Sequence, residues 1–448
     1  MQSKDTPLAF ADSGYTSWGR YPRVAHEAVF RVDWSQQVFP LLQQAAPASL
    51  LPYGLGRSYG DLCLNAGRSL VDCSHLNRFL AADFHEGWVR CEAGATMADI
   101  LNVIVPKGWF LPVTPGTKFV TLGGAIANDV HGKNHHRAGT FGCHVRKLAL
   151  CRSDAEVVIC GPSENAGLFN ATIGGLGLTG VILWAEIQLK AIQRIGIDLD
   201  VLPFTSLEKF LALTVESDQD YEYTVAWLDC LTAGRQRGIF FRGNHSAAPF
   251  PKIRAHKSPR VPFDFPEWTL NRFTMKALNA GYYWRNQHKK NPALVSYGPF
   301  FYPLDSIQQW NRVYGKQGFL QYQCVVPEHS FAAFEQLLEL VSQSGKGSFL
   351  AVLKRFGSRK SPGLLSFPRP GLTLALDFPM HGEATLRLLE TMDDVILKGG
   401  GAIYPAKDAR MSPAMFEASF PEWRKLRPYM DKKLSSSLWR RVTEGLQP

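Results

Sequence analysis

The chain has 448 residues, of which 45% are hydrophobic and 20% are charged; these values exclude a disordered chain and favour two packed domains. A formal net charge of +10 suits a nucleic acid, an anionic membrane surface or a phosphorylated substrate, and charge alone does not choose among them. The eight cysteines form no CxxC pair and no metal-ligand spacing, so we expect reduced, mostly buried thiols and no zinc site.

The first thirty residues have neither the basic start nor the unbroken apolar core of a secretory signal. No later apolar run reaches the roughly 18 residues that a membrane-spanning helix needs. We therefore expect a cytoplasmic protein without a membrane span.

From about residue 20 to 190, short apolar segments alternate with glycine-rich turns, which is typical of an α+β fold. Strands are predicted at SLLPYGLG, SLVDCSHL, WVRCEAGATM, KLALCRS, AEVVICGP and GVILWAEIQLKAI. MADILNVIVPKG predicts a helix, because Ile100, Leu101, Ile104 and Val105 fall on one face before a glycine stop.

Glycine becomes sparse near Lys190, and a second domain is predicted from about residue 194. FLQYQCVVP, FLAVLKRFG and GLTLALDFP read as strands, and the two-residue alternation places Gln321 and Gln323 on one face of the first of them. The segment from about residue 402 ends in a basic helix that we expect to return to the first domain.

Two basic stretches, residues 251–262 and 282–291, lie in the middle of the chain. One interpretation is a solvated loop and helix face. The other is a membrane-lying flap, aromatic and basic, over a site.

Two phosphate-binding patterns compete. GLGLTG, residues 175–180, fits GxGxxG, but a strand follows it where a Rossmann turn requires a helix. The alternative is a set of three glycine-rich stretches at 54–61, 115–136 and 174–180. Turns without side chains let backbone N–H groups point at an anion, and three such stretches predict an extended groove for a diphosphate.

GLGRSYGD, PGT…VTLGGAIANDVHGKNHH…GTFG, GGLGLTG and IYPAKDAR together resemble the FAD-binding domain of the vanillyl-alcohol-oxidase superfamily. Further matches at FYPLD, WNRVYG, FLQYQ and DFP are similar to its decaprenylphosphoryl-β-D-ribose 2′-oxidase subgroup. The resemblance implies an α+β fold in which residues 1–193 and 402–448 bind FAD. Residues 194–401 then form a substrate-binding cap of antiparallel sheet and helices.

Carried over residue by residue, the resemblance implies two sets of contacts. The expected FAD contacts are Gly54, Leu55, Gly56, Arg57, Ser58, Tyr59, Gly60, Asp61, Gly116, Thr117, Thr121, Gly123, Gly124, Asn128, His131, Ile182 and Tyr404. The expected substrate contacts are Lys133, Trp227, Tyr302, Gln321, Gln323, Lys354 and Lys407.

At the reacting centre the resemblance implies Lys407, His131 and Tyr59. Lys407 places a positive charge near flavin and substrate, and His131 acts as a base or as a hydrogen-bond donor. HGKNHH contains three histidines, but no carboxylate or cysteine ligand set accompanies them, so we expect no metal.

Two positions distinguish this chain within the superfamily. Many members carry a histidine in the first turn and bond it covalently to the flavin; Tyr59 stands in this turn, so we expect noncovalent FAD. Mycobacterial members carry a cysteine, used by covalent inhibitors, where this chain has Ala375. A catalytic thiol there is therefore excluded.

The implied reaction is FAD-dependent oxidation of the 2′-hydroxyl of a polyprenyl-phosphoryl-β-D-ribose, the first half of its epimerisation to the arabinose donor. A short-chain keto-reductase completes the epimerisation, a quinone reoxidises the flavin, and the protein sits peripherally at the inner membrane. One alternative is a soluble sugar or alditol oxidase that releases hydrogen peroxide. Another, a nucleic-acid-binding protein, lacks a recognised module, and its lysines are scattered, so no nucleic-acid partner is expected.

Overall fold

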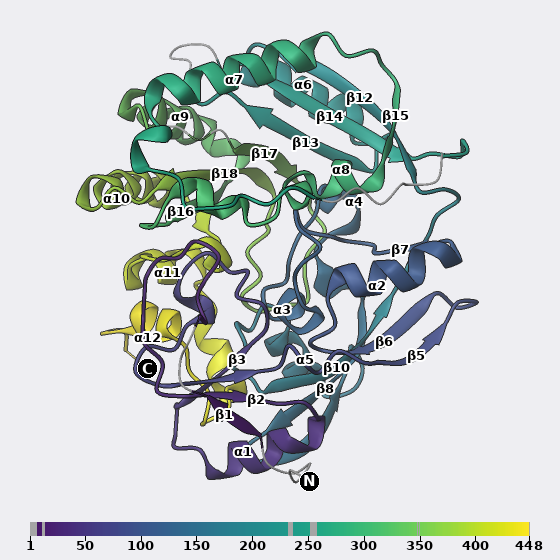
Figure 1. Ribbon diagram of the computed structural model, residues 1–448, viewed down its shortest axis with the longest axis vertical. Coiled ribbons are helices and arrows are strands. Elements are labelled where there is room, and N and C mark those ends of the chain that lie inside the picture. The colour runs from purple at the N-terminus through teal and green to yellow at the C-terminus, as the bar shows by residue number, and fades with distance from the viewer. Residues whose placement is uncertain are drawn as a thin grey trace.

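The computed structural model describes residues 7–10, 14–231, 236–250, 258–346, 348 and 350–447. Within them the strands form four sheets, and the mixture of helices and mainly antiparallel sheets confirms the predicted α+β class. Figure 1 shows two parts: a lower one that contains both ends of the chain and an upper one built on the largest sheet. Residues 251–257 of the first basic stretch lie outside the described residues.

Two sheets form the frame of the lower part. The first has the order β1-β2-β4-β3, from Leu8–Phe10, Val29–Arg31, Ser69–Asp72 and Leu50–Tyr53. The second has the order β5-β6-β10-β8-β9, from Phe79–Asp83, Trp88–Glu92, Val181–Gln188, Val145–Arg152 and Ala155–Cys160. β10 directly follows GLGLTG, as expected from the sequence, so this glycine motif does not open a Rossmann helix.

Short helices pack around these sheets. They are α1 Val38–Gln44, α2 Met97–Ile104, α3 Leu122–Ala127, α4 His135–Ala138 and α5 Ala166–Thr172. α2 starts in a capping box, because Thr96 Oγ1 accepts the Asp99 N–H while the Asp99 carboxylate accepts the Thr96 N–H. A two-stranded sheet of β7 Trp109–Phe110 and β11 Lys190–Ala191 closes this part.

The upper part is an eight-stranded antiparallel sheet with the order β15-β12-β14-β13-β17-β18-β16-β19. Its strands are β12 Gly196–Phe204, β13 Tyr223–Leu228, β14 Gly238–His245, β15 Ala293–Ser296, β16 Phe319–Val326, β17 Ala351–Phe356, β18 Gly371–Pro379 and β19 Ala402–Ile403. Its helices are α6 Leu207–Ser217, α7 Arg272–Gln287, α8 Tyr297–Phe301, α9 Phe331–Ser344 and α10 Glu383–Lys398.

The alternation along β16 and β18 separates a helix-packed face from a polar one. Tyr322 and Cys324 belong to the hydrophobic core that includes residues of α6, α9 and α10. Gln321 and Gln323 point the other way, as the alternation predicted, and pair with Asp377 and Ala375 of β18. This polar face is the one that the lower part approaches.

The last segment returns to the lower part through α11 Pro413–Ser419 and α12 Ser437–Thr443, which Figure 1 shows in yellow; just before α12, the Ser435 N–H donates to Leu50 O of β3. The change of sheet between β11 and β12 falls near residue 194. β19 begins at the predicted boundary at 402, so that boundary assigns it to the last segment, although it pairs with β16 of the upper sheet. We retain 1–193, 194–401 and 402–448 as a proposed division.

Across the described residues, no helix combines the length and apolar character needed to traverse a bilayer. All eight cysteines are free, and all but Cys63 and Cys143 are buried.

Candidate active site

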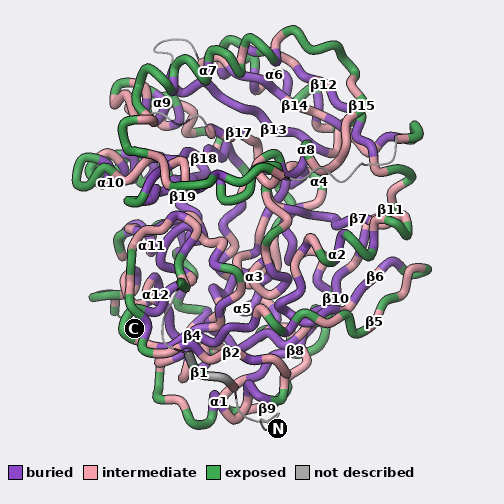
Figure 2. Tube along the Cα trace, in the orientation of Figure 1, coloured by how far each residue is buried: buried purple, intermediate pink, exposed green. Residues whose placement is uncertain are grey.

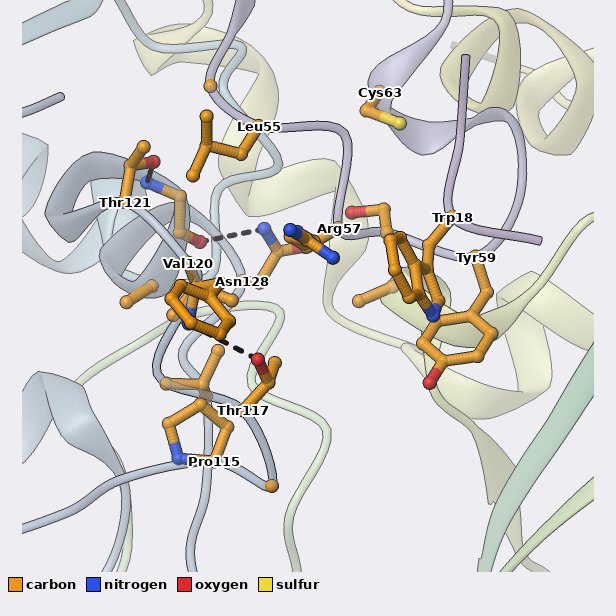
Figure 3. Close-up of a pocket in the computed structure, with 18 of the residues that line it drawn as sticks. Trp18, Leu55, Arg57, Tyr59, Cys63, Pro115, Thr117, Val120, Thr121 and Asn128 are labelled. Atoms are coloured by element: carbon orange, nitrogen blue, oxygen red, sulfur yellow. Dashed lines mark hydrogen bonds between the residues drawn. The ribbon is translucent and has the colours of Figure 1, made fainter. Parts of the chain in front are cut away.

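A cavity of about 730 Å³ lies between the two parts of the molecule. The residues that line it include members of the turn at 51–59, of 114–133, of 176–182, of β16–β18 and of 404–407. The expected residues that it brings together are Gly54, Leu55, Gly56, Arg57, Ser58, Tyr59, Gly116, Thr117, Thr121, Gly123, Gly124, Asn128, His131, Lys133, Ile182, Gln321, Gln323, Lys354, Tyr404 and Lys407. Figure 3 shows one end of this cavity.

The first turn is shaped by glycine. Gly56 has φ +58°, and a Cβ there would lie 2.1 Å from the Tyr53 hydroxyl. A Cβ on Gly54 would lie 2.6 Å from Thr121 Oγ1, which itself accepts the Gly124 N–H at the start of α3. The two glycine-rich loops therefore meet at a distance that only side-chain-free backbone permits.

Polar groups on this wall fit an extended, charged cofactor. Arg57 stacks 4.1 Å above the Trp18 ring, and its Nε is buried without a hydrogen-bond partner among the described residues. Asn128 donates from Nδ2 to Gly124 O, yet its Oδ1 is equally unpartnered. A Cβ on Gly116 would touch nothing within 4 Å, so this backbone faces open space. Buried polar atoms of this kind require a ligand that hydrogen-bonds them, and FAD supplies both donors and acceptors.

Lys407 lies over the ring of Tyr59 in the cavity wall. Its Nζ lies 3.7 Å from the centroid of the Tyr59 ring, a cation–π contact. The contact follows from the backbone, because the Tyr59 N–H donates to Ala406 O at 2.9 Å. Burial lowers the pKa of Lys407 to about 7, and the nearby Asp377 carboxylate opposes that shift.

His131 is held between two cap residues. Its Nε2 lies 3.0 Å from Gln323 Nε2, and its Nδ1 lies 3.1 Å from Lys354 Nζ. Burial, reinforced by Lys354, lowers the His131 pKa well below its usual value, so the ring is neutral near pH 7. A neutral imidazole has one nitrogen that accepts a hydrogen bond, and here both nitrogens already lie within hydrogen-bond distance of cap side chains.

Three lysines converge on the cavity: Lys133, Lys354 and Lys407. Enclosure by protein lowers the pKa of Lys133 to about 8 and that of Lys354 to about 7; for Lys354, the positive charge of Lys133 contributes. Lys133 also lies 4.8 Å from the Phe300 ring. A cluster of poorly solvated ammonium groups favours an anionic ligand, which returns each to its charged form.

Asp377 is a site residue that our reading of the sequence missed. It is fully buried on β18, accepts hydrogen bonds from Gln321 Nε2 and from the Tyr314 hydroxyl, and has a pKa raised to about 7 by burial. The available signal was a single carboxylate in the otherwise apolar strand GLTLALDFP, two residues after Ala375 and on the same face.

Four expected contacts do not line the cavity: Gly60, Asp61, Trp227 and Tyr302. Asp61 instead forms a forked ion pair with Arg441 of α12, at 2.6 and 2.9 Å, and Arg441 also contacts Asp408. Gly60 packs against the Asp408 backbone.

Trp227 and Tyr302 lie behind the cavity wall. The Trp227 ring packs on Tyr282 of α7 with centroids 4.7 Å apart. The Tyr302 hydroxyl shares a 2.7 Å hydrogen bond with Thr114, which does line the cavity. Neither residue contacts the cavity directly, so a role for either in binding the substrate stays a prediction.

Comparison with known proteins assigns a class to this site. A family model described as an FAD binding domain matches residues 27–161. The chain is also 31% identical over 30% of its length to L-gulonolactone oxidase of Mus musculus, of which it covers 30%. The protein is therefore a flavoprotein oxidoreductase, and FAD is its cofactor.

Longer matches define the family. The chain is 36% identical to decaprenylphosphoryl-β-D-ribose oxidase of Mycolicibacterium smegmatis, across 92% of this chain and 93% of that protein. It is 30% identical to an uncharacterized protein of Streptomyces coelicolor, across 78% of this chain and 99% of that protein. The chain belongs to the decaprenylphosphoryl-β-D-ribose oxidase family, which confirms the resemblance seen in its motifs.

Proposed function

We propose that the protein oxidises the 2′-hydroxyl of a polyprenyl-phosphoryl-β-D-ribose to the 2′-keto sugar. One observation carries the proposal: Lys133, Lys354 and Lys407 converge with His131 in the cavity that the glycine-rich FAD-binding turns also line. The lysines suit a phosphate ester, and the Gln321 and Gln323 amides suit sugar hydroxyls.

The reaction removes a hydride from C2′ and a proton from the 2′-hydroxyl. FAD, when bound along the glycine turns, supplies the two-electron acceptor. His131, kept neutral by burial, accepts a hydrogen bond or the proton, while Lys407 holds a positive charge at the reacting centre. Tyr59 supports the Lys407 ammonium with its ring face, and we propose that FAD is held there without a covalent link.

Three further assignments belong to this proposal. The keto product still carries its lipid phosphate, so a short-chain keto-reductase acting on the same lipid completes the epimerisation to the arabinose donor of the cell envelope. A quinone, itself a membrane lipid, accepts the electrons. Both require the protein to work peripherally at the inner membrane, and its net charge of +10 supports that location.

The test is anaerobic reduction of the purified yellow holoenzyme. A water-soluble, short-chain polyprenyl-phosphoryl-β-D-ribose is expected to bleach the flavin absorbance, whereas free ribose and free alditols leave it unchanged. Bleaching by free polyols, with peroxide release in air, would instead establish the sugar or alditol oxidase. That alternative has less support, because the similarity to L-gulonolactone oxidase covers under a third of the chain.

A further inference from the structure

The helix α7 has an inverted pattern of polarity. Its buried positions are Met275, Asn279 and Asn286, two of them amides. Asn279 donates to Asp229 of the cap, while Asn286 donates to the Tyr282 carbonyl of its own helix. Phe273, Leu278 and Trp284 are exposed instead, and Figure 2 shows α7 as largely exposed.

The outward face forms a continuous apolar stripe. Phe273, Ala277, Gly281 and Trp284 are spaced by four, four and three residues, which places them on one side of an α-helix. Phe273 is 82% exposed and Trp284 67% exposed. Just before the helix, Trp268 is 75% exposed. Soluble surfaces seldom gather aromatic side chains in this way, and such a patch marks an interaction site.

The basic residues around the stripe indicate what kind of surface it contacts. Between residues 272 and 290 there are five basic side chains, at 272, 276, 285, 289 and 290, and no acidic one. The preceding segment 263–270 carries two acidic residues, Glu267 and Asp264, and Asp264 forms ion pairs with Arg20 and Arg312. On the helical wheel Lys276 and Arg285 flank the stripe on opposite sides. Aromatic side chains bordered by lysine and arginine match the boundary between headgroups and acyl chains of an anionic bilayer.

Backbone hydrogen bonds connect the segment before the stripe to the cavity wall. Val261 donates its N–H to Gln308 O, and the Phe265 N–H donates to Arg312 O. Ile307 and Gln308 line the cavity, and Ile307 is itself an exposed apolar residue beside this link. On its other side, α7 contacts the strand that carries Val225 of the cavity wall, through Tyr282 and Trp227.

We propose that α7, with the preceding segment 263–270, is a docking surface that lies in the headgroup region of an anionic phospholipid bilayer and faces the cavity mouth toward it. This inference rests on the proposed function, because a lipid-phosphate substrate must pass from the bilayer to the lysine cluster. Docking through α7 and 263–270 brings the bilayer to the segment whose backbone pairs with Gln308 of the cavity wall.

The experiment is co-sedimentation of the full-length holoenzyme with vesicles of phosphatidylglycerol and phosphatidylethanolamine, or of phosphatidylcholine alone. The wild type is expected to bind the anionic vesicles and to be released by salt. The double substitution F273S/W284S is expected to weaken binding on the order of tenfold or more, since binding scales with the apolar area inserted. K289Q/K290Q is expected to weaken binding to anionic vesicles by about fivefold for each lysine removed.

The matched control is F79S/L80S, which removes two exposed apolar side chains from β5 in the lower part of the molecule and is expected to leave binding unchanged. The flavin absorption spectrum of each variant reports folding. Equal vesicle binding by wild type and F273S/W284S would overturn the proposal. Self-association that F273S/W284S abolishes, without vesicle binding by the wild type, would overturn it in favour of a second copy.

The two proposals fail separately. If vesicles do not bind but the short-chain substrate still bleaches the flavin, the docking surface is wrong and the activity stands. If vesicles bind through α7 but the lipid phosphoribose leaves the flavin oxidised, the docking surface stands and the substrate is wrong.

Discussion

Replacing Asp377 by Asn tests whether this buried carboxylate keeps Lys407 charged. The substitution preserves shape and leaves an amide oxygen for the Gln321 hydrogen bond, but it removes the negative charge that raises the pKa of Lys407. Lys407 has a pKa of about 7, so about half of the molecules carry its charge at neutral pH. An opposite charge at close range shifts a pKa by roughly one to three units.

If the pKa of Lys407 falls by one unit, about a tenth of the Lys407 side chains are charged at pH 7. Each pKa unit corresponds to about 1.4 kcal/mol of free energy between the two protonation states. Because the protonated form is the active one, activity persists below the pKa and is lost above it. In Asp377→Asn the loss is therefore expected to move to lower pH. At acidic pH, where Lys407 is again protonated, the variant recovers the wild-type rate.

The assay is stopped-flow reduction of bound flavin by short-chain substrate, under anaerobic conditions, from pH 5 to pH 9. Tyr314→Phe is the matched control, because it deletes a hydrogen bond to Asp377 and keeps the carboxylate. The pH at which half of the reduction rate is lost is expected to be higher in Tyr314→Phe than in Asp377→Asn. A rate in Asp377→Asn that falls equally at every pH would refute the electrostatic role and show a merely structural one.

Other outcomes follow from the same geometry. Lys407→Met is expected to slow flavin reduction on the order of a hundredfold with full FAD content; an unchanged rate would exclude the lysine from the reacting centre. Acid precipitation is expected to leave a colourless pellet, since Tyr59 forms no histidyl link; a yellow pellet would show covalent flavin. Gly56→Ala is expected to lower FAD retention and melting temperature more than Gly67→Ala, because both glycines have positive φ but only Gly56 lacks room for a Cβ. Arg441→Gln is expected to destabilise the fold by about 3 kcal/mol in denaturant unfolding, as it leaves two buried carboxylates without their partner.

Local patterns in the sequence were enough to predict much of the frame. The alternation in FLQYQCVVP placed Gln321 and Gln323 on the cavity side, and the strand after GLGLTG excluded a Rossmann turn. The helix predicted around Ile100 is present as α2. These features depend on neighbours a few residues apart, which is the range over which periodicity carries information.

The remaining features depend on partners that are distant in the chain. Asp61 was expected at the cofactor because it follows the first turn, but its partner Arg441 lies 380 residues away. The stripe on α7 resembles a buried face by composition alone. The contacts of Asn279 with Asp229 and of Tyr282 with Trp227 determine which side packs inward, and both partners lie some fifty residues earlier in the chain.

The ion pairs of Arg441 with Asp61 and Asp408 join residues that are synthesised at very different times. The first glycine turn is made early, yet the ion pair behind it and the backbone bond from Tyr59 to Ala406 involve residues near the end of the chain. Chains on the ribosome fold from the N-terminus as they emerge. The nascent lower part therefore lacks the Tyr59–Ala406 hydrogen bond and the Asp61–Arg441 ion pair until residues 406 and 441 have been synthesised.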